Sequence, residues 1–232
     1  MTVTHLRLMA LILMLSACGE PVTRDSTARI LLMGDSLMAS HKLTGQSVSH
    51  ALEKELGTQV TDRSVIGARM IYVLPISGSA GLNIPKQYHD GDWDWIIVNG
   101  GGNDIWFGCG CAVCNRRIDR LISDDGRSGV IPGLLSRLRA TGAQVIYVGY
   151  LRTPGVNSPI EGCADEGDKM DARMARLAEL DGGLHFLSLA DMVPPGDRSH
   201  HAIDLIHPSV KGSAAIADRI AGIIRRNDPA HD

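Results

Sequence analysis

A serine, a histidine and an aspartate in this sequence have the types and spacing that nucleophilic catalysis requires. Ser36 closely follows an apolar run at residues 30–33, and Asp204 precedes His207 by three positions. A serine hydroxyl is a weak nucleophile until a neighbouring base takes its proton, and a carboxylate bonded to the imidazole orients that base. The pattern predicts Ser36 as the nucleophile, His207 as the base and Asp204 as the residue that orients it.

Two further polar clusters are expected on the same side of the molecule. They are Ser64-Val65-Ile66-Gly67 and Gly101-Gly102-Asn103-Asp104, and each follows a segment predicted to be a strand. In an open parallel sheet, the loops at the carboxyl ends of the strands converge on the ligand site. Each of these two clusters, and each of the segments around Ser36 and around Asp204 and His207, also fits a plain structural explanation when taken alone. For example, the segment around Ser36 could be a turn in which the serine caps a helix. The order and shared placement of these four segments favour catalysis.

Strands and helices alternate along the chain. Continuous apolar runs at residues 30–33, 95–99 and 145–148 are typical of buried parallel strands, and weaker strand patterns cover residues 59–65 and 185–189. Helical periodicity is found at residues 48–56, 131–138 and 216–224. The alternation predicts an α/β fold with a central parallel sheet of about five strands between helical layers.

The four clusters, taken in order, resemble the recurring blocks of the SGNH hydrolase family, also called the GDSL family. The resemblance implies a flavodoxin-like three-layer sandwich and a serine esterase that forms an acyl-enzyme on Ser36 with carboxylic esters or thioesters. It also implies an oxyanion hole made by the backbone amides of Ser36 and Gly67 and the side chain of Asn103. The block around Gly67 departs from the family pattern, because Asp62 and Arg63 precede it where many relatives carry an asparagine-containing block.

The resemblance also implies roles for two further aspartates and leaves other functions open as alternatives. Asp35 and Asp104 are expected to hold their loops through hydrogen bonds. An O-acetylesterase of polysaccharides or an acyltransferase of the cell envelope would use the same residues, and a non-catalytic binding lipoprotein would retain only the fold. Serine catalysis needs no cofactor and no metal, so none is expected.

Composition limits the range of partners. The net charge is −3, 44% of the residues are hydrophobic, and no basic block is present. A nucleic-acid partner is therefore not expected. The expected partners are a small-molecule, glycan or lipid ester as substrate and a membrane.

The membrane partner follows from the N-terminus. Residues 6–17 form a short apolar run after Arg7, and the run ends in Leu15-Ser16-Ala17-Cys18. This segment resembles the processing site of bacterial lipoproteins and predicts a signal peptide over residues 1–17, a lipid on Cys18, a tether over residues 18–28 and a hydrolase domain over residues 29–228. Gly19 favours the periplasmic side of the outer membrane within the cell envelope.

Four other cysteines remain: Cys109, Cys111, Cys114 and Cys163. In an exported chain an even number favours disulfides, with three connectivities open, whereas a tetrahedral zinc site is the alternative. Three of them belong to an insertion at residues 107–114, which we expect to be a loop beside the substrate cleft. Trp106 and Phe107 either line that cleft or pack under the loop.

Overall fold

The computed structural model describes residues 29–155 and 158–227. Cys18, the predicted signal peptide at residues 1–17 and the rest of the tether lie outside these described residues, as does residue 228 at the end of the predicted domain. Within the described ranges, no helix combines the length and apolar character needed to cross a bilayer.

A single parallel sheet forms the centre of the fold. Its strands are β1 (Ile30–Met33), β2 (Val60–Asp62), β3 (Trp95–Asn99), β4 (Gln144–Val148) and β5 (Leu184–Leu187). They pair in the order β2-β1-β3-β4-β5, and every pairing is parallel. This is the flavodoxin-like strand order, so the predicted fold class is confirmed.

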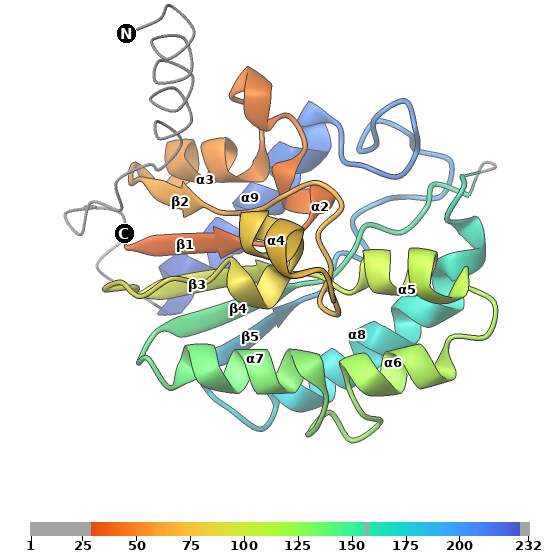
Figure 1. Ribbon diagram of the computed structural model, residues 1–232. Helices are drawn as coiled ribbons and strands as arrows, with labels where there is room; N and C mark the ends of the chain where they lie inside the picture. The colour runs from red at the N-terminus through yellow and green to blue at the C-terminus, as the bar shows by residue number, and fades with distance from the viewer. Residues whose placement is uncertain (1–28, 156–157, 228–232) are drawn as a thin grey trace, which may run out of the picture.

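Helices cover both faces of the sheet (Figure 1). The α-helices are α2 (Ser36–Ala39), α3 (Val48–Leu56), α4 (Pro75–Ser77), α5 (Gly102–Cys109), α6 (Asn115–Leu121), α7 (Val130–Arg139), α8 (Ala164–Ala178) and α9 (Val210–Asn227). Short turns of other helix types are η1 (Lys42–Thr44), η2 (Gly78–Leu82), η3 (Ile84–Lys86) and η4 (Glu161–Cys163).

The alternation of side chains along the strands creates two hydrophobic cores. Leu31, Ile96, Val145 and Leu184 are neighbours across four strands and face the core shared with α6, α7 and α8. Residues one position along, such as Ile97, face the opposite core with α3 and α9. Because both faces are covered, the strands are apolar along their whole length, which explains the continuous runs in the sequence.

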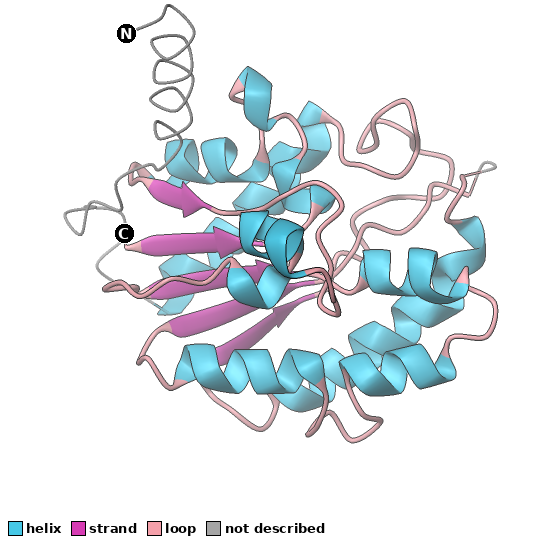
Figure 2. Ribbon diagram, in the orientation of Figure 1, coloured by secondary structure: helices cyan, strands magenta, loops and turns pink. Residues whose placement is uncertain are grey.

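The strands all point toward one edge of the sheet, where α5 begins (Figure 1). The loops that leave this edge connect the strands to the helices behind and in front of the sheet (Figure 2). Side chains from three of these loops and from the turn before α9 therefore meet at one place, which is the arrangement expected from the sequence.

Some sequence predictions need correction. The second strand is shorter than the predicted 59–65, and the insertion at 107–114 is helical as far as Cys109 rather than a loop. Helix α8 was not predicted, because its sequence is rich in charged residues and buries few apolar side chains, among them Met170 and Met174.

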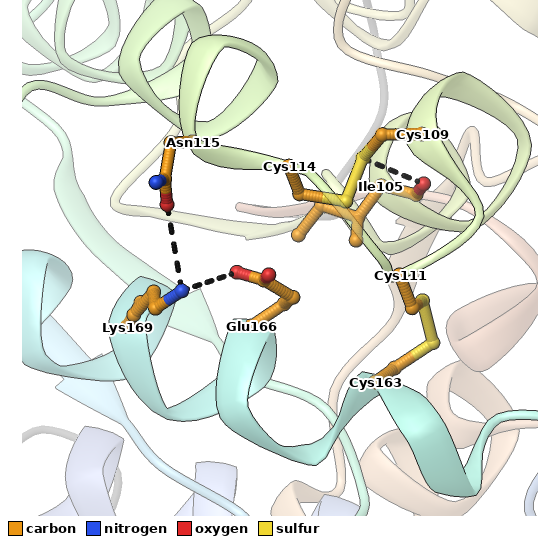
Figure 3. Close-up of a disulfide and its surroundings, with 8 residues drawn as sticks. All are labelled: Ile105, Cys109, Cys111, Cys114, Asn115, Cys163, Glu166 and Lys169. Atoms are coloured by element: carbon orange, nitrogen blue, oxygen red, sulfur yellow. Dashed lines mark hydrogen bonds and ion pairs between the residues drawn. A yellow bond between two sulfur atoms is a disulfide. The ribbon is translucent and has the colours of Figure 1, made fainter.

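The four cysteines form two disulfides, Cys109–Cys114 and Cys111–Cys163 (Figure 3). The first closes the turn between α5 and α6. The second joins that turn to the start of α8, 52 residues away in the chain. Within the described ranges, no group of three or more histidine, cysteine, aspartate or glutamate side chains is arranged to hold a metal ion. The disulfide prediction is confirmed, and the pairing selects one of the three open connectivities.

Candidate active site

Ser36 is held at the end of β1 by its own loop. Asp35 is the N-cap of α2, and its Oδ1 accepts a hydrogen bond of 3.0 Å from the amide of Leu37. Asp35, rather than Ser36, therefore caps the helix, and the Ser36 hydroxyl is available for another partner. Gln87 fixes Gly34, two positions before Ser36. Its side-chain amide accepts from the Gly34 N–H at 2.7 Å and donates to the Gly34 carbonyl at 2.9 Å.

The partner of the Ser36 hydroxyl is His207. Ser36 Oγ lies 2.9 Å from His207 Nε2, and His207 Nδ1 lies 2.6 Å from Asp204 Oδ2. A carboxylate can only accept, so Nδ1 carries the ring proton and Nε2 is left to accept from the serine. The three residues predicted from the sequence are therefore brought into one hydrogen-bonded chain.

Asp204 also shapes the loop that carries the histidine. Its Oδ1 accepts from the amides of Ile206 and His207, each at 3.0 Å. Partial burial raises the pKa of Asp204, but the bonds from the His207 ring and from these two amides outweigh burial and hold the pKa below its ordinary value. Asp204 is thus kept ionised, as a residue that orients a base must be.

The loop around His207 is bonded to its surroundings on several sides. The His207 carbonyl accepts from the Ala202 amide at 2.8 Å, and the Leu205 carbonyl accepts from Ser158 Oγ at 2.8 Å. Pro208 follows the histidine but precedes the last helix, because α9 begins at Val210. Pro208 instead forms an isolated bridge with His201. The bridge and the hydrogen bonds together fix the position of the imidazole.

Asn103 and Gly67 belong to segments that hydrogen bonds hold together. Asn103 Nδ2 donates to the Ala68 carbonyl at 3.0 Å, which uses one of its two amide hydrogens and leaves the other for a ligand. Asp104 accepts from the amides of Met70 and Ile71, both at 2.8 Å, and so ties the segment after Gly67 to α5. Gly67 lies in a turn with a φ of 80°, a conformation that side chains disfavour.

Tyr150 connects the two halves of the site, and sequence reasoning missed it. Its hydroxyl donates to Asp35 Oδ2 at 2.5 Å and accepts from the Gly102 amide at 2.9 Å. A Cβ at position 102 would lie only 2.7 Å from the Tyr150 ring, so the contact requires glycine there. Tyr150 follows the end of β4, and its place at the carboxyl edge of the sheet was the available signal.

A cavity of about 120 Å³ opens beside these groups. Ser36, Asn103 and His207 line it, whereas Gly67 and Asp204 do not. Trp106 is one of its walls, which is one of the two alternatives that the sequence left open. Phe107 lies outside it, where its exposed ring stacks on Trp106 with the centroids 4.8 Å apart. The reactive groups thus face a defined space.

The sequence of the chain matches the model of one protein family. Residues 32–215 match the GDSL-like lipase/acylhydrolase family, a range that includes all four polar clusters. The chain belongs to this family. It is accordingly an SGNH-type hydrolase that acts on ester bonds. Curated proteins include none whose sequence matches the chain significantly.

Several solved structures have a similar fold. A protein from Slackia heliotrinireducens assigned as an SGNH hydrolase has a TM-score of 0.60 at 20% identity, over 84% of this chain and 97% of that one. One from Agrobacterium tumefaciens assigned as an arylesterase has a TM-score of 0.61 at 17% identity, over 86% and 99%. An acetyl xylan esterase from Butyrivibrio proteoclasticus has a TM-score of 0.57 at 14% identity, over 87% and 64%.

The buried carboxyl of Asp35 makes the stability of this hydrolase depend on pH. Burial raises the pKa of Asp35 from 3.8 to about 6, although the bonds from Tyr150 and Leu37 act to lower it. The folded chain therefore binds this proton more tightly than the unfolded chain, and the contribution of Asp35 to stability falls as the pH rises from 3.8 through 6.

Asp35→Asn removes this titration. We expect the free energy of unfolding of the variant, relative to the natural chain, to increase by roughly 2–3 kcal/mol between about pH 4 and pH 7. Urea unfolding at a series of pH values measures the difference. Any pH-independent cost of the substitution shifts all points equally, so a difference that stays constant over this range contradicts the prediction.

Proposed function

We propose that this SGNH hydrolase cleaves carboxylic esters or thioesters through an acyl-enzyme on Ser36. The observation that carries the proposal is the hydrogen-bonded chain from Ser36 through His207 to Asp204, which opens on a cavity. The three side chains that move the proton are hydrogen-bonded to one another before any substrate is bound.

In the first half of the reaction, Ser36 Oγ bonds to the acyl carbon and its proton moves to His207 Nε2. The carbonyl oxygen becomes an oxyanion, and the amides of Ser36 and Gly67 and the free hydrogen of Asn103 are suited to donate to it. When this intermediate collapses, the bond to the leaving oxygen or sulfur breaks. His207 returns the proton to the leaving group, which departs as an alcohol or thiol.

In the second half, a water molecule takes the place of the leaving group. His207 accepts its proton, the hydroxide attacks the acyl carbon, and the bond to Ser36 breaks as the proton returns to Oγ. The product is a carboxylic acid. Throughout, the ionised Asp204 stabilises the imidazolium form of His207 and keeps its ring in place.

Hydrolysis of p-nitrophenyl acetate by the full-length chain tests the proposal. We expect Ser36→Ala and His207→Ala each to lower kcat by at least about 1,000-fold, because each removes a member of the unit that transfers the acyl group. Thermal unfolding of both variants controls for loss of the fold. Turnover that persists in well-folded Ser36→Ala would contradict the mechanism.

The proposal also includes anchoring in the cell envelope. It is supported by the sequence Leu15-Ser16-Ala17-Cys18 after a short apolar run, outside the described residues. We expect the protein isolated from its source to begin at Cys18 and to carry a diacylglyceryl group there. Mass spectrometry of the N-terminal peptide tests this, and a peptide that begins upstream of Cys18 or lacks the lipid mass contradicts it.

A further inference from the structure

Beyond the reactive groups, helices α5 and α8 form part of the wall of the cavity beside Ser36. Helix α5 contributes Ile105 and Trp106, and α8 contributes Ala164, Gly167 and Met170. Positions 164, 167 and 170 recur every three residues, so they share one face of α8. Ile160, just before η4, also lines the space. The part of the cavity beyond the reactive groups is thus mainly apolar.

The charged residues in the wall are already paired with one another. Arg152 Nη2 lies 2.8 Å from Asp168 Oδ1 and 2.9 Å from Asp171 Oδ2. Its Nη1 donates to the Tyr150 carbonyl at 3.1 Å, and Asp171 also accepts from Ser188 Oγ at 2.7 Å. Because these groups have protein partners, they attract neither an anionic nor a cationic substituent of a substrate, and the apolar walls decide what binds.

The two walls are also fixed relative to each other. The Cys111–Cys163 disulfide joins the turn after α5 to the start of α8, and Cys163 itself lines the cavity (Figure 3). Farther along α8, Lys169 Nζ lies 3.1 Å from Glu166 Oε2 and 3.4 Å from Asn115 Oδ1 of α6 (Figure 3). A cavity with walls tied in this way has a set width and length.

We propose that this cavity binds one unbranched apolar chain of the ester, about six carbons long, and that Trp106, Ile160 and Ala164 set the length. The inference rests on the proposed function, since it places that chain beside the Ser36 hydroxyl. An apolar cavity of about 150 Å³ binds benzene, which has six carbons. A cavity of about 120 Å³ is of comparable size.

The apolar chain belongs to either the acyl or the alcohol part of the ester, and two substrate series distinguish these. The first is p-nitrophenyl esters from acetate to decanoate, and the second is acetates of alcohols from ethanol to decanol. In one series we expect kcat/KM to rise about fourfold for each added methylene. The rise should end near six carbons, and longer chains should gain nothing or lose rate.

Paired variants test the walls. Ala164→Leu adds a bulky side chain to the wall of the cavity. It should lower the ratio of kcat/KM for the six-carbon ester to that for the two-carbon ester at least tenfold, whereas Ala172→Leu makes the same change on an exposed part of α8 and should leave this ratio unchanged. Trp106→Ala should move the optimum to longer chains. Its control, Phe107→Ala, alters the stacked ring outside the cavity and should not move the optimum.

A binding measurement makes the test independent of turnover. Titration calorimetry of Ser36→Ala should show hexanamide or hexyl acetate binding at least tenfold more tightly than acetamide or ethyl acetate, with this difference lost in Ser36→Ala combined with Ala164→Leu. If kcat/KM does not change with chain length in either series and the short and long ligands bind equally well, the cavity assignment is overturned. Hydrolysis that still depends on Ser36 would leave the mechanism intact in that case. Loss of Ser36 dependence with preserved chain-length discrimination overturns only the mechanism.

Discussion

The hydrogen bond of 2.9 Å between Ser36 Oγ and His207 Nε2 joins residues 171 positions apart in the chain, and the proposed chemistry depends on it. Neither residue is held by that bond alone. Ser36 is fixed by the cap from Asp35 and by the clamp of Gln87 on Gly34. His207 is fixed by Asp204, whose two oxygens bond to the ring and to the backbone of the same loop. The parallel sheet brings these two independently ordered loops to the same edge.

A second set of hydrogen bonds, buried or partly buried, joins the loop of the serine to the segments of Asn103 and Gly67. The Tyr150 hydroxyl bonds to Asp35 and to the Gly102 amide, so the loop with the nucleophile and the loop with Asn103 share one partner. Asp104 then ties that second loop to the segment after Gly67. Burial makes such contacts costly to leave unsatisfied, which favours a single arrangement of the site before substrate arrives. Burial destabilises the ionised form of the Asp35 carboxyl, and the protein tolerates that cost beside its nucleophile.

Much of the fold was predictable, because both faces of the sheet are covered and its strands therefore read as continuous apolar runs. The predicted strand at residues 95–99 coincides with β3, and the helical periodicity at residues 48–56 coincides with α3. Helix α8 escaped prediction because charged residues are frequent along it, and Met170 and Met174 are its only fully buried apolar side chains. Disulfide pairing and the roles of Gln87 and Tyr150 depend on contacts between distant segments, which local patterns do not encode.

Covalent labelling identifies the residue that attacks the ester. A p-nitrophenyl alkylphosphonate leaves a stable phosphonyl ester on a serine that attacks it, and release of p-nitrophenolate reports the rate. We expect one adduct per chain, located by peptide mass spectrometry on Ser36, with labelling abolished in Ser36→Ala and strongly slowed in His207→Ala. An adduct on another residue, or labelling of the Ser36→Ala variant at the natural rate, would contradict the assignment of Ser36 as the nucleophile.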